Sequence, residues 1–166
     1  IEDYVLIAYV PYAQRDERAF YDFLVYTRGV PGDQIRLLDG GAGKEQIVEA
    51  LEAASGDVGS GGTLWVYFAG HGAADPSTGE RMLLGDDVRQ DPAAFASRAV
   101  PLSQVHYIAE GKELMLVLDA CYNGMGRSGD ELVAGKRFVV PAAAIKASAG
   151  RTEWTAAAPD ELSGPL

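Results

Sequence analysis

One cysteine and one glycine-flanked histidine are the residues of this chain that could together support covalent chemistry. Cys121 is the only cysteine among the 166 residues, and it follows the apolar run 113–118. A thiolate is a strong nucleophile, but an unperturbed cysteine is mostly protonated at neutral pH. A neighbouring imidazole can accept the thiol proton and return it to a leaving amine. His71 lies between Gly70 and Gly72, directly after the apolar run 63–69, and is the candidate for that base.

Each of these residues also has an ordinary structural interpretation. A free cysteine is often a small buried hydrophobe, and a lone histidine is often a satisfied surface or core group. The context favours chemistry in both cases. Cys121 lies just past a predicted strand, at the junction where the chain enters the turn that begins with Tyr122. The glycines beside His71 permit close approach of a ligand to the backbone. The other histidine, His106, has no such context and is predicted to be structural.

The elements that must position this pair alternate along the chain. Apolar β-rich runs predict strands, and apolar residues at helical spacing predict helices. The expected strands are 4–10, 35–38, 63–69, 113–118 and 151–157, and the expected helices are 16–28, 44–54 and 102–109. A small hairpin around 81–84 is expected within the long connection 72–101. This order predicts an α/β fold with a mostly parallel sheet and helices on both faces.

The parallel sheet also predicts where the two candidate residues meet. Ligands bind beyond the carboxyl ends of the strands in such sheets. If strands 63–69 and 113–118 are neighbours, their ends bring His71 and Cys121, which are 50 residues apart, to one edge. The backbone N–H groups of Gly72 and Cys121 are then expected to stabilise an oxyanion.

Composition and charge narrow the function classes. The formal net charge is −10, which makes nucleic-acid binding a poor expectation and favours cationic peptides, although acidity could simply aid solubility. No apolar run approaches the length of a membrane helix, so no membrane partner is predicted, and no signal peptide is visible. A single cysteine excludes an internal disulfide and Cys₂His₂ zinc sites, and it indicates a reducing compartment; a cytoplasmic location is expected.

Two motifs of the chain carry a resemblance to a known family. The sequence YFAGHG at 67–72, followed by DACYNG at 119–124, resembles the catalytic motifs of the caspase, metacaspase and orthocaspase group of cysteine peptidases. The resemblance covers nearly the whole chain and implies a three-layer α/β/α sandwich, with 1–166 as one catalytic domain. Within it, 1–123 is similar to the family's large subunit, 124–150 to its flexible intersubunit loop, and 151–166 to the start of its small subunit. The small-subunit part is therefore expected to be incomplete at residue 166.

The resemblance also implies roles for individual residues. Cys121 is the expected nucleophile, His71 the general base and acid, and Gly72 a contributor to the oxyanion hole. Asp119 matches the metacaspase position that binds a basic side chain in the primary specificity pocket, and Asp16 resembles a second pocket acid at the start of the first helix. Carboxylates hold a guanidinium through charge-assisted bidentate bonds, so cleavage after Arg or Lys is predicted. Two structural alternatives stay open, with Asp119 capping a strand–turn junction and Asp16 as a helix N-cap.

Two other functions and several dependent features remain open at this point. One alternative is a catalytically inactive caspase-like interaction or regulatory module, and another is caspase-type cleavage after Asp. No metal or other cofactor is predicted. Calcium activation is not supported, because 101–104 lacks the carboxylates found there in calcium-dependent relatives.

Self-processing and partners complete the expectations. The loop between the subunit-like parts contains Arg127, Lys136 and Arg137, which are candidate self-cleavage sites, although an ordinary exposed loop is the plain alternative. The expected partners are a peptide or protein with a basic residue before the scissile bond, and the chain's own C-terminal fragment.

Overall fold

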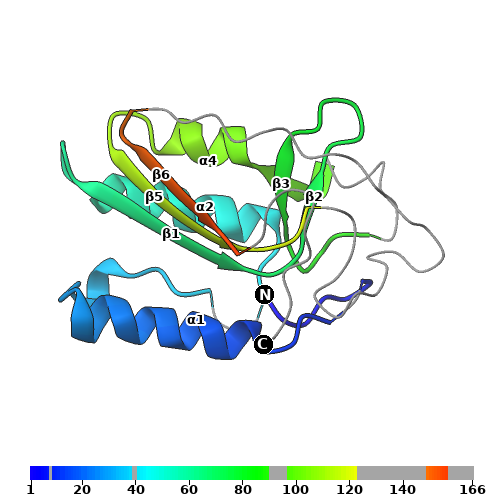
Figure 1. The fold of residues 1–166 in the computed structure, drawn as a ribbon, viewed down its shortest axis with the longest axis horizontal. Helices are drawn as coiled ribbons and strands as arrows, with labels where there is room; N and C mark the ends of the chain where they lie inside the picture. The colour runs from blue at the N-terminus through cyan, green and yellow to red at the C-terminus, as the bar shows by residue number, and fades with distance from the viewer. Residues whose placement is uncertain (8, 39–40, 90–96, 123–148, 157–166) are drawn as a thin grey trace.

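The structure, a computed structural model, describes residues 1–7, 9–38, 41–89, 97–122 and 149–156. Within these residues the fold is α/β. It contains a three-stranded parallel sheet, a separate three-stranded antiparallel sheet and helices on both faces of the parallel sheet (Figure 1). None of the helices in the described ranges is long and apolar enough to span a lipid bilayer.

The parallel sheet carries the two motifs. Its order is β1–β5–β6, formed by β1 (Thr63–Ala69), β5 (Glu113–Asp119) and β6 (Arg151–Thr155). The registers run without interruption, with Ala69 opposite Asp119 at the carboxyl ends of β1 and β5. The predicted strands at 63–69 and 113–118 are thus confirmed, and the strand predicted at 151–157 is confirmed as far as Thr155. The condition that the first two strands are neighbours is met.

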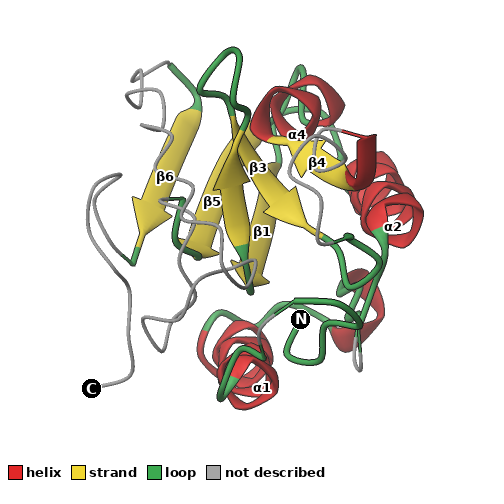
Figure 2. Ribbon diagram, turned by 90° about the vertical axis from the view of Figure 1, so that its right-hand side faces the viewer, coloured by secondary structure: helices red, strands yellow, loops and turns green. Residues whose placement is uncertain are grey.

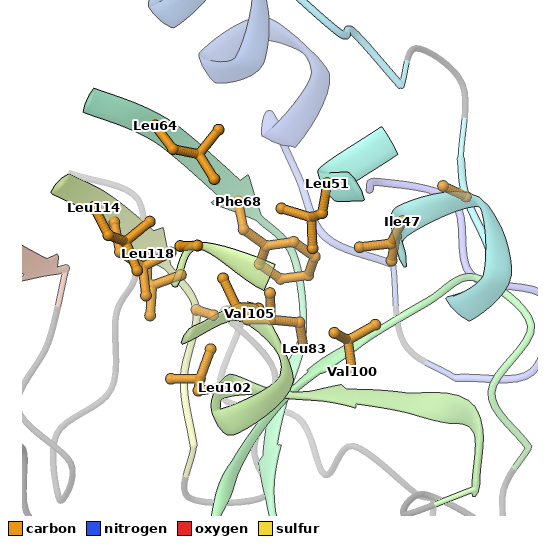
Figure 3. Close-up of a cluster of buried hydrophobic side chains, with 14 of the residues drawn as sticks. Ile47, Leu51, Leu64, Phe68, Leu83, Val100, Leu102, Val105, Leu114 and Leu118 are labelled. Carbon is orange, nitrogen blue, oxygen red and sulfur yellow. The ribbon is translucent and has the colours of Figure 1, made fainter. Parts of the chain in front are cut away.

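Side chains alternate between the faces of the sheet, and one face builds the main core. Leu64 and Phe68 on β1 and Leu114, Leu116 and Leu118 on β5 pack against α2 (Lys44–Asp57) and α4 (Leu102–Ile108), as Figure 3 shows for several of them. The helices contribute Ile47, Leu51, Leu102 and Val105 to this cluster. Both helices were predicted, α2 from its apolar spacing and α4 as a short helix, and both are confirmed.

The opposite face of the sheet is covered by α1 (Ala13–Asp22), which continues as a π-helical turn, η1 (Phe23–Thr27). Phe20 stacks on Tyr67 of β1 with ring centroids 4.4 Å apart, and Trp65 contacts Phe20 and Phe23. Figure 1 shows α1 on one side of the sheet and α2 and α4 on the other. The helix predicted at 16–28 is confirmed, but it begins at Ala13.

The antiparallel sheet follows β1 directly. It has the order β2–β3–β4, formed by β2 (Gly72–Ala74), β3 (Arg81–Leu84) and β4 (Ala99–Pro101). Figure 1 labels β2 and β3, and Figure 2 labels β3 and β4. The hairpin predicted around 81–84 is confirmed as the β2–β3 pair, whereas the sequence did not predict β4.

The strand predicted at 4–10 is wrong. The described residues of this segment form a bent loop, and Val5 is 75% exposed. Polar contacts override the β-rich composition. The Glu2 carbonyl oxygen accepts a hydrogen bond from the Val10 N–H, and the Glu2 carboxylate accepts one from the Gln14 N–H. Tyr4 meanwhile turns inward towards the end of β1.

The strand predicted at 35–38 is also wrong. A short 3₁₀ turn, η2 (Gly32–Gln34), precedes it, and its backbone is extended without joining the described sheets. Among the described residues, 35–38 forms no ladder with the outer edge of β1. Instead it lines a cavity of about 590 Å³ between α1, α2 and β1. Side chains from both faces of β1 line this cavity, so it lies along the outer edge of that strand.

Candidate active site

The carboxyl ends of β1 and β5 bring the two sequence motifs together. Ala69 and Asp119 are paired in register, and the Gly70 N–H donates to the Asp119 carbonyl oxygen at 3.2 Å. His71 and Cys121 therefore leave adjacent parallel strands at the same edge of the sheet. Both are buried, at 3% and 6% exposure.

The two motifs also approach each other closely at Gly72. A Cβ atom at this position would lie 2.8 Å from the Cys121 carbonyl oxygen and 2.7 Å from Cε1 of Tyr122. Such distances are shorter than real carbon contacts, so a side chain at position 72 would push the two motifs apart. The glycine is needed here for close backbone approach. The structure therefore brings His71, Gly72 and Cys121 together at the edge formed by the carboxyl ends of β1 and β5, as expected for neighbouring strands.

The pairing of β2 with β3 leaves the Gly72 N–H outside the strand ladder. The Leu84 N–H donates to the His71 carbonyl oxygen at 3.0 Å, so His71 and Leu84 form a hydrogen-bonded pair. Antiparallel ladders alternate such pairs with non-hydrogen-bonded ones, and Gly72 opposite Leu83 is the next pair. The Gly72 N–H consequently points away from β3 and takes no part in the β2–β3 ladder.

Tyr4 is a site neighbour that the sequence analysis missed. Its hydroxyl accepts a hydrogen bond from the His71 backbone N–H at 2.8 Å and donates one to the Leu84 carbonyl oxygen at 3.1 Å. The phenol hydroxyl thus takes the place of a direct hydrogen bond from the His71 N–H to the Leu84 carbonyl oxygen. Its ring packs on the imidazole at a centroid distance of 4.7 Å. Burial raises the pKa of Tyr4 above its ordinary value, which keeps the hydroxyl protonated.

The first glycine of the motif is explained by the same contact. A Cβ atom at Gly70 would lie 2.6 Å from the Tyr4 hydroxyl oxygen and 3.0 Å from Cζ of Phe68. The Tyr4 hydroxyl can therefore occupy its position only because residue 70 has no side chain. No local sequence pattern could have revealed this contact, because Tyr4 and His71 are 67 residues apart.

A buried ion pair lies beside Tyr122, the residue that follows the cysteine. Arg81 on β3 and Glu153 on β6 form two hydrogen bonds, one of them from Nη2 to Oε2 at 3.0 Å, and their side chains are 8% and 12% exposed. The Arg81 guanidinium also lies over the Tyr122 ring, 5.4 Å from its centroid. The Tyr122 hydroxyl is buried without a hydrogen-bond partner in the described part of the chain. The sequence analysis missed these three residues too.

The two candidate pocket acids lie at the same end of the molecule. Asp119 ends β5 on the face that α1 covers, since the inward positions Leu114, Leu116 and Leu118 alternate with it. Asp16 lies in the first turn of α1, whose Ala13 packs against Ala69. The alternative of Asp16 as the helix N-cap is wrong, because Tyr12 occupies that position.

The remaining candidates concern ions and self-cleavage. No group of three or more His, Cys, Asp or Glu side chains suited to a metal ion occurs in the described ranges. Arg127, Lys136 and Arg137, the predicted self-cleavage sites, lie outside the described residues. The cavity beside β1 is separate from the candidate site, and neither His71 nor Cys121 lines it.

Comparisons with known proteins add no relative. No protein-family model matches the chain, and neither a curated protein nor a solved structure matches it. The proposals below therefore depend on the residues themselves and on the motif resemblance.

Proposed function

We propose that this chain is a cysteine endopeptidase that cleaves after Arg or Lys. The observation that supports it best is the contact between the motifs, where Gly72 abuts the Cys121 backbone at the shared edge of β1 and β5. A lone buried cysteine and a lone buried histidine have no structural reason to leave neighbouring strands side by side. A nucleophile and its base need that arrangement.

The proposed mechanism uses the dyad in two half-reactions. His71 accepts the thiol proton as the Cys121 sulfur attacks the scissile carbonyl carbon. The N–H groups of Gly72 and Cys121 stabilise the oxyanion that forms. The carbon–nitrogen bond then breaks, and His71 gives its proton to the leaving amine. Water, deprotonated by His71, hydrolyses the resulting thioester and frees the sulfur.

The proposed specificity rests on carboxylates. Asp119 lies two residues before the nucleophile on the face of the sheet covered by α1, and Asp16 lies in the first turn of that helix. A guanidinium or ammonium group beyond the carboxyl end of β5 would find negative charge there, and a formal net charge of −10 would favour its approach. Cleavage after Asp would need cationic pocket groups instead, and Arg15, beside Asp16, is 73% exposed in its side chain.

The wider proposal is a caspase-like domain of the metacaspase or orthocaspase type. It rests on the YFAGHG and DACYNG motifs together with the observed α/β sheet, in which both motifs follow adjacent parallel strands. Self-processing after Arg127, Lys136 or Arg137 belongs to the same proposal, as does a retained C-terminal fragment as partner.

The burial of the dyad favours a second candidate function. His71 and Cys121 are 3% and 6% exposed, so only a small part of either residue is open to a peptide. A catalytically inactive interaction module does not need an accessible sulfur. The two candidates differ in whether any peptide is turned over.

Fluorogenic peptides ending in Arg, Lys or Asp, offered with and without calcium, test the proposal. We expect cleavage after Arg or Lys that is lost in Cys121→Ala and in His71→Ala. His106→Gln is the matched control, since this other histidine lies on α4, and Gln keeps a neutral polar side chain of similar size beside Arg81 and Glu153 and is expected to leave turnover unchanged. Failure of the wild-type protein to cleave any peptide would favour the interaction module, and cleavage only after Asp would refute the proposed pocket.

A further inference from the structure

The buried pair Arg81–Glu153 joins the two sheets of the fold at one point. Arg81 comes from β3 in the antiparallel sheet, and Glu153 comes from β6 in the parallel sheet, 72 residues later in the chain. The fork of the guanidinium matches the carboxylate with two hydrogen bonds. Figure 2 shows β3 beside the sheet that contains β6. The ion pair therefore fixes the position of one sheet relative to the other.

A chain of contacts leads from this pair to the candidate nucleophile. The Arg81 guanidinium lies 5.4 Å from the centroid of the Tyr122 ring. The edge of that ring faces the Gly72 backbone, where a Cβ atom would lie within 2.8 Å of both Cδ1 and Cε1. The Cys121 carbonyl oxygen lies against the same glycine. Movement of Arg81 would consequently free the Tyr122 ring and change the spacing of Gly72 and Cys121.

Stability alone is a weak reason for this arrangement. Desolvation of two charges offsets most of their attraction, and apolar residues of similar volume are often as stabilising as a buried ion pair. Tyr122 adds a buried hydroxyl without a partner in the described residues, which is a further cost. Both costly features meet at Tyr122, the residue that follows the candidate nucleophile.

We propose that Arg81 and Glu153 are positioning residues that act through the Tyr122 ring on the oxyanion donors, the N–H groups of Gly72 and Cys121. This inference rests on the proposed peptidase function and deepens it. The site is then complete only while β6 stays paired with β5, because β6 supplies Glu153. A carboxylate on the third strand of the sheet thereby controls the geometry of groups at the ends of the other strands.

The test separates positioning from stability through three variants. Arg81→Met and Glu153→Leu each leave one buried charge unpaired, so both should lower the melting temperature. The double variant removes both charges and should recover the melting temperature. Its kcat for an Arg-terminated peptide should stay between about tenfold and a hundredfold below wild type, since a displacement of about 1 Å can cost that much. KM should change less than about twofold.

A second readout distinguishes the oxyanion donors from the thiol. Alkylation of Cys121 by iodoacetamide displaces iodide without forming an oxyanion, so its rate should change less than about twofold in the double variant. The matched control is the exposed ion pair Arg36–Asp57, whose Arg36→Met and Asp57→Leu variants should leave kcat unchanged.

Three results would overturn the inference. Recovery of kcat together with the melting temperature in the double variant would show a merely structural pair. An alkylation rate that falls as much as kcat would place the effect on the thiol instead of the oxyanion donors. Wild-type protein that cleaves no peptide would refute the proposed function and this inference with it, whereas the first two results would refute the inference alone.

Discussion

Replacing Tyr4 by Phe removes one oxygen atom and tests how the histidine loop is held. The hydroxyl joins the His71 N–H, at 2.8 Å, to the Leu84 carbonyl oxygen, at 3.1 Å. Both residues are buried, so neither backbone group finds water after the substitution. The aromatic ring stays in place against the imidazole, and the change is confined to the two hydrogen bonds.

The expected loss of stability follows from the two backbone groups, the His71 N–H and the Leu84 carbonyl, that lose their hydrogen-bond partner. Leaving a buried donor or acceptor unpaired costs about 1–3 kcal/mol each. The two groups face each other across the β2–β3 ladder, so they can move closer and form a direct hydrogen bond. Such a bond would restore part of the lost stability. We therefore expect Tyr4→Phe to lower the free energy of unfolding by about 2–4 kcal/mol. Tyr122→Phe is a matched control, because its buried hydroxyl has no described partner, and it should change that free energy by less than about 1 kcal/mol.

Urea unfolding of the two variants, beside wild type, measures the difference. Gly70→Ala extends the test, since its Cβ atom would lie 2.6 Å from the Tyr4 hydroxyl oxygen. That substitution should cost less when Tyr4 is already Phe, with a coupling of at least about 1 kcal/mol. Equal effects of Tyr4→Phe and Tyr122→Phe, or strictly additive effects of Tyr4→Phe and Gly70→Ala, would refute the reasoning.

Three further predictions concern the site and its surroundings. Gly72→Ala should lower peptide turnover at least about tenfold, because its Cβ atom would lie 2.8 Å from the Cys121 carbonyl oxygen, whereas Gly56→Ala on α2 meets nothing within 4 Å and should leave turnover unchanged. Asp119→Asn should lower kcat/KM for Arg peptides by about tenfold or more while the Cys121 alkylation rate holds, and an unchanged preference for Arg would contradict the proposed pocket. Hydrogen bonds from Ser77 and Thr78 lower the pKa of Asp75 to about 2. The stabilisation of this turn should therefore be fully present above about pH 4 and be lost as the pH falls through about 2. An NMR titration of Asp75 with a midpoint at the ordinary aspartate value would exclude this.

Continuous apolar runs were the part of the fold that sequence could predict. β1 and β5 are seven-residue strands whose apolar residues pack into an α/β core, and their composition predicts buried strands of a parallel sheet. That the two strands are neighbours was a condition, which the structure meets. The meeting of His71 and Cys121 at one edge followed from that pairing alone. The spacing of apolar residues predicted α2, because this helix buries one face against the sheet.

The residues behind the site could not be predicted, because their contacts have no local pattern. Tyr4 reaches His71 across 67 residues, and Arg81 reaches Glu153 across 72. The error at 4–10 has a related cause. β-rich composition describes a fit to a half-buried pleated surface, and tertiary contacts decide whether that surface exists. Here Glu2 bends the segment and Tyr4 anchors it in the candidate site.

Because the His71 N–H donates to the Tyr4 hydroxyl and not to a strand carbonyl, the hydrogen exchange of this amide depends on the N-terminal segment. In an ordinary hairpin, such a proton exchanges with solvent deuterium when the two strands separate. Here its acceptor is the Tyr4 hydroxyl, so exchange follows the opening of the segment 1–7 while the β2–β3 pairing stays intact. One amide on the candidate base thus reports the local stability of the N-terminal segment, and its protection factor measures how often that segment leaves the site.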